Sequence, residues 1–366
     1  MKLSTTRESL LKPLQAVIGV VERRQTMPVL ANVLLQAKEN SLAVTATDLE
    51  VELVAKSEVD TIDVPGDITV PGRKLLDICR ALPEGSVVKM NLKGDRLTVQ
   101  SGRSKFVLST LPATEFPVVE DISADRSLMI NQGELCQLLD KTHFAMAQQD
   151  VRYYLNGLLL ETGEGKLRAV ATDGHRLALC DIALTEADGE LNQVIVPRKG
   201  VLELQRLLEG DEHVQIAFGS NHIRVDVGNI RFTSKLIDGR FPDYGRVIPA
   251  TKSNVVKASR DTLRQGLQRA AILSNEKYRG VRLEFNKGSI RILANNPDQE
   301  EAEDEVEVDY SGEQMEIGFN VNYLLDALAA VNDENVEVGL VDPSSSCVVR
   351  APSDKASLYV VMPMRL

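Results

Sequence analysis

Tryptophan is absent from this chain of 366 residues, and aromatic residues make up only 4% of it. Its cores must therefore be built from aliphatic side chains. Cysteine is rare, and the four thiols stand far apart, without the spacing of a zinc site or a disulfide framework: Cys79, Cys136, Cys180 and Cys347. This pattern is typical of a reducing cytoplasm. We expect no metal and no cofactor.

The sequence also has no secretory leader, no long apolar run, no phosphate-binding glycine loop and no dinucleotide-binding fingerprint. It therefore predicts a cytoplasmic protein without a membrane partner. The net charge of −11 argues weakly against a nucleic-acid partner, because phosphate contacts need basic surface. However, residues 298–309 hold eight of the acidic residues, whereas many lysines and arginines lie on or near predicted helices. Two interpretations of this charge distribution are open: a basic face that contacts phosphates, or a surface of evenly mixed charge.

What the chain does have is an internal repeat. Residues 171–179 (ATDGHRLAL) are echoed at 46–54 (ATDLEVELV) and more weakly at 294–296, at separations of 173 − 48 = 125 and 294 − 171 = 123 residues. Each copy has a first amphipathic helix, near 8–14, 134–139 and 261–267, and a second helix that follows 70–71, 196–197 and 319–320. The sequence thus predicts three α+β units of one design, over 1–122, 127–249 and 254–366.

Local signals refine these elements. Thr5 and Asn131 each precede a glutamate by three residues, the spacing of a helix cap, and Pro13 predicts a first helix that starts late or bends. The second helices are expected to bury a leucine-rich stripe, namely Leu75, Ile78 and Leu82 in copy one and Leu204, Leu207 and Leu208 in copy two. Gly102 and Gly228 mark tight hairpins between the last strands of copies one and two.

One cluster resembles a catalytic site. Asp173 and His175 are two residues apart and would share a face of a strand, so that the carboxylate could orient the imidazole. Copy one has Leu49 and Glu50 in place of Gly174 and His175, and Asp-Gly is also an ordinary turn. We favour a turn with a surface contact over a hydrolase.

Two further stretches indicate binding. Residues 148–154 (QQDVRYY) combine polar, basic and aromatic side chains, which suits contact with a sugar–phosphate backbone, although one tyrosine could pack under the loop. Residues 360–366 are apolar almost throughout, which predicts a buried last strand at Val360 and Val361. Met362 and Met364 would then form either more core or a groove wall that adapts to partner peptides.

Taken together, these segments closely resemble the bacterial sliding clamps, the β subunits of DNA polymerase III, from end to end. The most specific matches are 149–157, 171–177, 238–244, 270–277 and 359–366. The resemblance implies three tandem clamp domains with helices lining a central hole and antiparallel sheets outside, in a ring-shaped head-to-tail homodimer. It implies a DNA-encircling processivity factor in DNA replication, not an enzyme and without 3'-5' exonuclease activity. The implied partners are sequence-independent double-stranded and primed DNA, a second copy, the replicative polymerase, the clamp loader, and other polymerases and repair proteins.

The resemblance also assigns residues to two surfaces. The implied DNA contacts are Arg24, Arg73, Gln149, Tyr153 and Tyr154. In the implied dimer interface, Phe106 and Leu108 pack on Ile272 and Leu273 of the next protomer. Its charged pairs set Lys74, Arg96 and Arg103 against Asp298, Glu300 and Asp304. Such pairs orient assembly more than they set affinity.

A partner-peptide groove is implied between domains two and three, for short segments that contain glutamine, leucine and phenylalanine. Its implied walls are Leu155, Thr172, Gly174, His175, Arg176, Leu177, Pro242, Arg246, Val247, Tyr278, Asn320, Tyr323, Ser346, Val360, Val361, Met362, Pro363 and Met364. This chain departs from the family at two places, with Pro343-Ser344 where an apolar rim residue is frequent and Tyr278 where phenylalanine is usual. A protein-binding scaffold that does not bind DNA is a further alternative.

Overall fold

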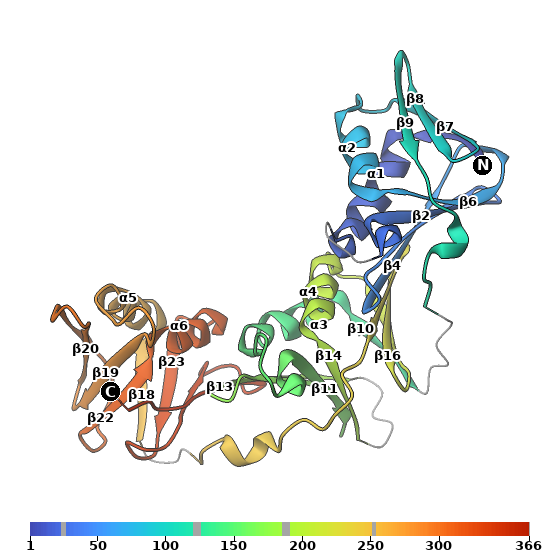
Figure 1. Ribbon diagram of the computed structural model, residues 1–366. Helices are drawn as coiled ribbons and strands as arrows, with labels where there is room; N and C mark the ends of the chain where they lie inside the picture. Colours follow the sequence, from blue (N-terminus) through green and yellow to red (C-terminus); the bar gives the residue numbers. More distant parts are fainter. Residues whose placement is uncertain (23–26, 120–125, 185–190, 251–253, 366) are drawn as a thin grey trace. The chain divides into compact units, whose positions relative to one another are not determined.

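The computed structural model describes residues 1–22, 27–119, 126–184, 191–250 and 254–365, and each of the three predicted copies folds as two helices with eight or nine strands. Copy one comprises β1 Lys2–Thr6, α1 Arg7–Val17, β2 Asn32–Lys38, β3 Ser41–Thr47, β4 Val51–Glu58, β5 Thr61–Val64, β6 Gly66–Pro71, α2 Gly72–Ala81, β7 Val87–Lys93, β8 Arg96–Ser101 and β9 Ser104–Ser109. In copies one and three the two helices pack against each other (Figure 1).

Copies two and three repeat this order without a counterpart of β5. Copy two comprises β10 Arg126–Asn131, α3 Gln132–Asp140, β11 Gly157–Gly163, β12 Lys166–Thr172, β13 Arg176–Ala183, β14 Asn192–Pro197, α4 Arg198–Leu207, β15 His213–Phe218, β16 His222–Val227 and β17 Ile230–Lys235. Copy three comprises β18 Asn254–Ser259, α5 Arg260–Ala271, β19 Gly280–Asn286, β20 Ser289–Asn295, β21 Glu301–Glu307, β22 Met315–Asn320, α6 Val321–Ala330, β23 Asn335–Leu340, β24 Cys347–Arg350 and β25 Ser357–Val361. No helix within these described ranges is both long and apolar enough to cross a membrane.

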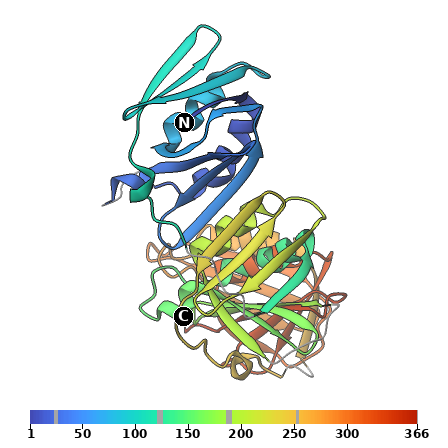
Figure 2. The same cartoon turned by 90° about the vertical axis from the view of Figure 1, so that its right-hand side faces the viewer.

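The sheets do not follow the copies. One eight-stranded sheet runs β10-β15-β16-β17-β4-β3-β2-β6, and another runs β14-β11-β12-β13-β25-β24-β23-β18. In each, the last strand of one copy pairs with the fourth core strand of the copy before it. Two smaller sheets remain, β5-β1-β7-β8-β9 and β21-β20-β19-β22. The hairpin of β8 and β9 stands at one end of copy one (Figure 2), and β9 is an edge strand there.

The cores are aliphatic, as the composition predicts. The chain forms two compact units, one of residues 1–135 and 199–236 and the other of residues 136–198 and 237–366. In the first, Leu10 and Leu14 of α1 are fully buried, and the helix packs on β3 and β4. In the second, Leu263 and Leu267 of α5 are buried, and this helix packs on β20 and β21. The predicted helical faces are confirmed.

Three local predictions need correction. Thr6, not Thr5, caps α1, because its Oγ1 accepts a hydrogen bond from the Ser9 N–H (3.2 Å) while Thr5 is buried in β1. Pro13 lies inside α1, which begins at Arg7 and so does not start late, and the predicted bend stays a prediction. In α2 and at its C-cap, Leu75 and Leu82 are buried as predicted, but Ile78 is only half-buried, and Leu76 and Cys79 are buried in addition. The predicted cap at Asn131 is confirmed, since its Oδ1 accepts from the Glu134 N–H (3.2 Å).

Candidate functional site

The turn between β12 and β13 is built by Thr172 and Asp173. Asp173 Oδ1 accepts hydrogen bonds from the backbone N–H groups of His175 (2.9 Å) and Arg176 (3.0 Å). Thr172 Oγ1 accepts from the Gly174 N–H (3.1 Å) and donates to the Arg176 carbonyl (2.6 Å). Gly174 has a φ of +88°, where glycine is favoured. The motif with the strongest sequence echo is therefore a side-chain-stabilised turn.

This geometry does not support the hydrolase alternative. The second carboxylate oxygen of Asp173 accepts from Arg176 Nε (3.1 Å), so the carboxylate is bound to the backbone and to Arg176. The His175 ring instead stacks on Tyr323, with ring centroids 6.4 Å apart and planes at 18°. Asp173 and His175 therefore serve the turn and a contact with copy three, rather than an acid–base pair.

Arg176 fixes this turn to copy three. Its guanidinium forms an ion pair with Asp326, donates to the Phe144 carbonyl (2.8 Å) and lies over the Tyr323 ring, 4.6 Å from its centroid. A cation held over an aromatic face in a partly dry site is stabilised electrostatically. Because the Arg176 side chain is only 14% exposed, it supports the predicted groove wall more than it forms its surface.

The C-terminal strand lies beside the same turn. Leu177 of β13 pairs with Val360 of β25, and Val360 and Val361 are each 1% exposed, which confirms the predicted buried last strand. Beyond it the Met362 N–H donates to the His175 carbonyl, and the Met364 N–H donates to the Gly318 carbonyl, both at 2.9 Å. The tail thus connects β13 to β22 and leaves the side chains of residues 362–364 half-buried.

An apolar cluster lies under the linker that follows β17. Leu177 and Val360 belong to it together with Phe241, and Tyr154 and Val247 pack against it. The linker crosses this face of the sheet and includes the short 3-10 helix Tyr244–Val247. Contacts or strand pairing thus connect ten of the predicted wall residues: Thr172, Gly174, His175, Arg176, Leu177, Val247, Tyr323, Val360, Val361 and Met362.

The other predicted wall residues differ in their contacts and in their exposure. The Asn320 amide donates to the Tyr278 carbonyl (3.3 Å), and the Tyr278 ring is 57% exposed beside Lys277. Arg246 is exposed and pairs with Asp243 (2.8 Å). Leu155 is buried, and the Ser346 side chain is half-buried. Pro242 and Pro363 also stay predictions as wall residues.

The loop that holds Ser344, a predicted rim of the groove, is fixed by one carboxylate. Asp342 accepts from the Ser344 hydroxyl (2.6 Å), the Ser345 hydroxyl (2.6 Å) and the Ser344 N–H (2.8 Å). These hydrogen bonds lower the pKa of Asp342 to about 2, so the rim is anionic at neutral pH. Strand pairing of Cys347 with Val361 sets this loop next to the C-terminal tail. Ser344 therefore belongs to a polar, charged loop, whereas the resemblance implied an apolar residue at this predicted rim.

The predicted DNA-contact loop adjoins the same turn. Arg152 donates to both oxygens of Asp150 and to the Asp173 carbonyl (3.2 Å), and a Cβ on Gly174 would lie 3.0 Å from its guanidinium. Hydrogen bonds from Arg152 lower the pKa of Asp150 to about 2. Arg152 is in none of the three predicted sets, which are the DNA contacts, the groove walls and the dimer interface. Its position two residues after Asp150 nevertheless suits this bidentate pair. It connects the loop to the turn.

The predicted DNA-contact residues differ in exposure. Gln149 and Tyr153 are exposed, whereas Tyr154 is half-buried against the apolar cluster, as the alternative of a tyrosine packed under the loop expected. Arg73 is exposed on α2, and one of its nitrogens donates to the Val21 carbonyl (2.8 Å). Arg24 lies outside the described residues.

The predicted interface residues lie on or near the two edge strands. Phe106 and Leu108 are on β9, and Ile272, just after α5, is 75% exposed. Leu273 is half-buried, and Leu108 is 8% exposed within its own chain. Asp304 on β21 already pairs with Arg269 (2.5 Å). The other predicted charges are exposed: Lys74, Arg96, Arg103, Asp298 and Glu300.

Three copies joined through shared sheets, with a turn-based groove candidate, define a repeat-built binding protein of clamp architecture. The chain matches the N-terminal, central and C-terminal domains of the DNA polymerase III beta subunit over residues 1–120, 129–243 and 245–365. It belongs to the DNA polymerase III beta subunit family. It is 54% identical to the beta sliding clamp of Pseudomonas aeruginosa and 51% identical to that of Escherichia coli K12, over 100% of each chain. The crystal structure of the Pseudomonas aeruginosa subunit superposes with a TM-score of 0.98 at 53% identity, over 100% of both chains.

Proposed function

We propose that this chain is a sliding clamp that encircles duplex DNA as a head-to-tail homodimer and tethers the replicative polymerase to its template. Helices line the central hole, and the sheets form the outside of the ring. The protein confers processivity and performs no chemistry of its own. It acts on DNA inside the bacterial cell, and we assign it to the cytoplasm.

The observation that carries this proposal is that two sheets of the chain end in equivalent edge strands, β9 and β21, which the other copies use for pairing. Within the chain, β17 pairs with β4 and β25 pairs with β13, which completes two eight-stranded sheets. The equivalent strands β9 and β21 are the edges of a five-stranded and a four-stranded sheet. An unpaired strand edge is a template for another chain. If β9 of one protomer pairs with β21 of the next, every copy gains the same neighbours, and two chains close a ring of six domains.

The repeat also predicts the register of that pairing. Phe232 sits opposite Val225 in its hairpin, as Phe106 sits opposite Val99, and across the sheet Phe232 pairs with Leu53. Leu53 pairs with Ala46, just as Ala302 pairs with Ala294, the matching residue of copy three. The same transfer therefore places Phe106 opposite Ala302 of the partner subunit. Arg103 then lies near Asp304, and Arg96 near Glu300, in agreement with the proposed charge pairs.

The closed ring holds DNA topologically, because the duplex passes through its central hole, rather than by tight contacts. The proposed contact residues are Arg24, Arg73, Gln149, Tyr153 and Tyr154. Few phosphate contacts without base readout leave all positions along the duplex nearly equal in energy, so the ring can slide. Partner proteins dock short peptides in the proposed groove, where the half-buried Val247, Met362 and Met364 offer apolar surface for anchor side chains. The clamp loader and other polymerases are expected to share it.

A closed ring around DNA should be retained on circular DNA and lost from DNA with free ends. The dimer loaded on nicked circular DNA should persist at a salt concentration that strips ordinary phosphate contacts, and it should leave once a restriction enzyme linearises the circle. Gel filtration of loaded DNA before and after cutting measures both states. Equal retention on circular and linear DNA would rule out encirclement. If Arg24→Ala and Arg73→Ala changed neither loading nor retention, the DNA-independent scaffold would be favoured.

A further inference from the structure

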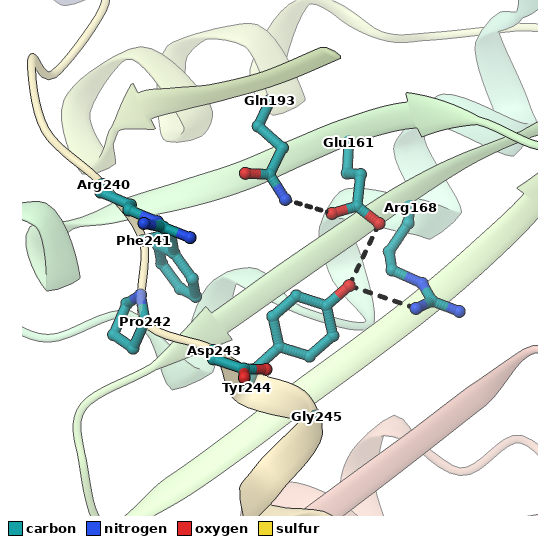
Figure 3. A pocket seen from close by; sticks show the side chains of 9 residues that line it. All are labelled: Glu161, Arg168, Gln193, Arg240, Phe241, Pro242, Asp243, Tyr244 and Gly245. Carbon is teal, nitrogen blue, oxygen red and sulfur yellow. Dashed lines mark hydrogen bonds between the residues drawn. The ribbon is translucent and has the colours of Figure 1, made fainter. Parts of the chain in front are cut away.

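A polar pocket of about 580 Å³ lies between the strands β11, β12 and β14 and the linker after β17. Its lining includes Glu161, Arg168, Gln193, Arg240 and Tyr244. Arg240 stands on one side of the pocket and the group of Glu161, Arg168 and Tyr244 on the other (Figure 3). None of these residues belongs to the proposed DNA, groove or dimer sets.

Every charged side chain that lines the pocket, except Arg240, has a hydrogen-bond or ion-pair partner among the described residues. Arg168 forms a two-point ion pair with Asp181 (2.6 and 2.7 Å) and donates to the Tyr244 hydroxyl (3.2 Å). Glu161 accepts from Gln193 (2.5 Å) and from the Tyr244 hydroxyl (3.1 Å). Asp243, at the rim, pairs with Arg246. Arg240 is exposed and has no hydrogen bond or ion pair among the residues that the structure describes. Its five N–H donors are open.

The pocket adjoins the proposed groove. Pro242 lines the pocket and is also a predicted groove wall, and Phe241 beside it belongs to the apolar cluster that contains Leu177. The two places share one sheet face. Asp181, behind the pocket, is 181 − 177 = 4 residues along β13 from Leu177, a distance of about 13 Å at the usual strand rise. An extended peptide anchored in the groove would reach the pocket with a residue about four positions outside the anchor.

We propose that this pocket is a second recognition site for partner proteins and that Arg240 binds an aspartate or glutamate in the segment flanking the groove-binding peptide. This inference rests on the proposed function. A guanidinium with open donors is complementary to a carboxylate and holds it through two parallel hydrogen bonds. Glu161 opposes this only weakly, because Gln193 and Tyr244 occupy its oxygens and Arg168 lies beside the same phenol. Partners with acidic flanks would thereby be preferred over partners with the same anchor and neutral flanks.

The test uses the full-length dimer and synthetic peptides. One short peptide carries only the glutamine, leucine and phenylalanine anchors, and extended versions carry glutamate, alanine or lysine about four residues beyond either end. For at least one end, we expect the glutamate extension to bind roughly tenfold more tightly than the alanine one, the scale of a charge-assisted hydrogen bond. Arg240→Glu should abolish that gain, Arg240→Lys should keep part of it, and the lysine peptide should bind Arg240→Glu better than the wild type.

Matched controls distinguish a failure of the proposed groove from a failure of the pocket proposal. Arg231→Glu makes the same charge change on β17, outside the pocket, and should leave every affinity unchanged. Failure of the short peptide to bind any protein would contradict the groove. Normal binding of the short peptide, with no gain from glutamate at either end or with an equal gain in Arg240→Glu, would overturn the pocket proposal alone. Preference of the wild-type protein for the lysine extension would overturn it in favour of Glu161 as the recognising group.

Discussion

Asp48 and Asp173, 125 residues apart, make the same pair of backbone hydrogen bonds. Asp48 Oδ1 accepts from the N–H groups of Glu50 (2.9 Å) and Val51 (2.7 Å), as Asp173 Oδ1 does from His175 and Arg176. The second oxygens differ, since that of Asp48 pairs with Lys199 and that of Asp173 with Arg176. One turn thus recurs in two copies, but only the second adjoins the proposed groove.

This pair provides a matched test of the groove. Asp48→Ala and Asp173→Ala each remove the acceptor of two backbone N–H groups, one at an exposed residue and one at a buried or half-buried residue, so each should lower the free energy of unfolding by about 1–3 kcal/mol. The Asp48 variant should lose more, because the Asp48 side chain is only 4% exposed, against 16% for Asp173. Only Asp173→Ala should weaken partner-peptide binding. Urea unfolding and peptide titration measure the two effects, and equal loss of peptide affinity in both variants would contradict the assignment of the groove to the second turn.

Acid should destabilise the junction of copies two and three through Asp354. Burial raises the pKa of Asp354, but hydrogen bonds from Lys141 (2.5 Å) and Ser357 (2.5 Å) outweigh it and bring the pKa to about 2, below its ordinary 3.8. A carboxyl group whose pKa is lower in the folded chain contributes stability above its unfolded pKa and loses it as the pH falls. This contribution, about 2 kcal/mol, should be complete above pH 4 and vanish toward pH 2.

The variant Asp354→Asn should be less stable at pH 7 and should show a smaller loss of stability between pH 4 and pH 2 than the wild type. Denaturant unfolding at a series of pH values measures this difference. Asp342→Asn is the control, because the pKa of Asp342 is also about 2 but the group lies in an exposed turn. If Asp354→Asn retained the full wild-type pH dependence, the ion pair with Lys141 would not be its source.

The C-terminal tail should be required for peptide binding but not for the dimer. Deletion of residues 362–366 removes the N–H groups that bond His175 and Gly318 and removes two half-buried methionines, while β9 and β21 keep all their residues. We expect peptide affinity to fall below detection in fluorescence titration, with the dimer unchanged in sedimentation. Unaltered peptide affinity would remove the tail from the groove.

The sequence predicted what depends on periodicity and repetition, and it could not predict what depends on long-range pairing. The six helices, the hairpins and the aliphatic cores follow from local spacing, as Leu263 and Leu267 illustrate. Arg176 was assigned to the groove surface, yet it is mostly buried, because its partners Phe144, Tyr323 and Asp326 come from distant segments. The pocket beside Arg240 was not predicted at all, since Glu161, Arg168 and Gln193 meet only through strand register. No local signal marks such a site.

The proposed ring makes a prediction at single-residue precision. If β9 pairs with β21 of the partner subunit in the register that the repeat dictates, Val107 lies opposite Glu301 of the partner subunit. Both side chains are exposed in the single chain, and Cys79, Cys180 and Cys347 are buried. The double variant Val107→Cys, Glu301→Cys should therefore form a covalent dimer with two disulfides under mild oxidation, visible on a non-reducing gel.

Val107→Cys with Glu303→Cys shifts the register by two residues and should crosslink much more slowly, because directly opposed residues are closest. Equal crosslinking of both pairs would contradict the register, and no dimer with either pair would contradict the interface itself.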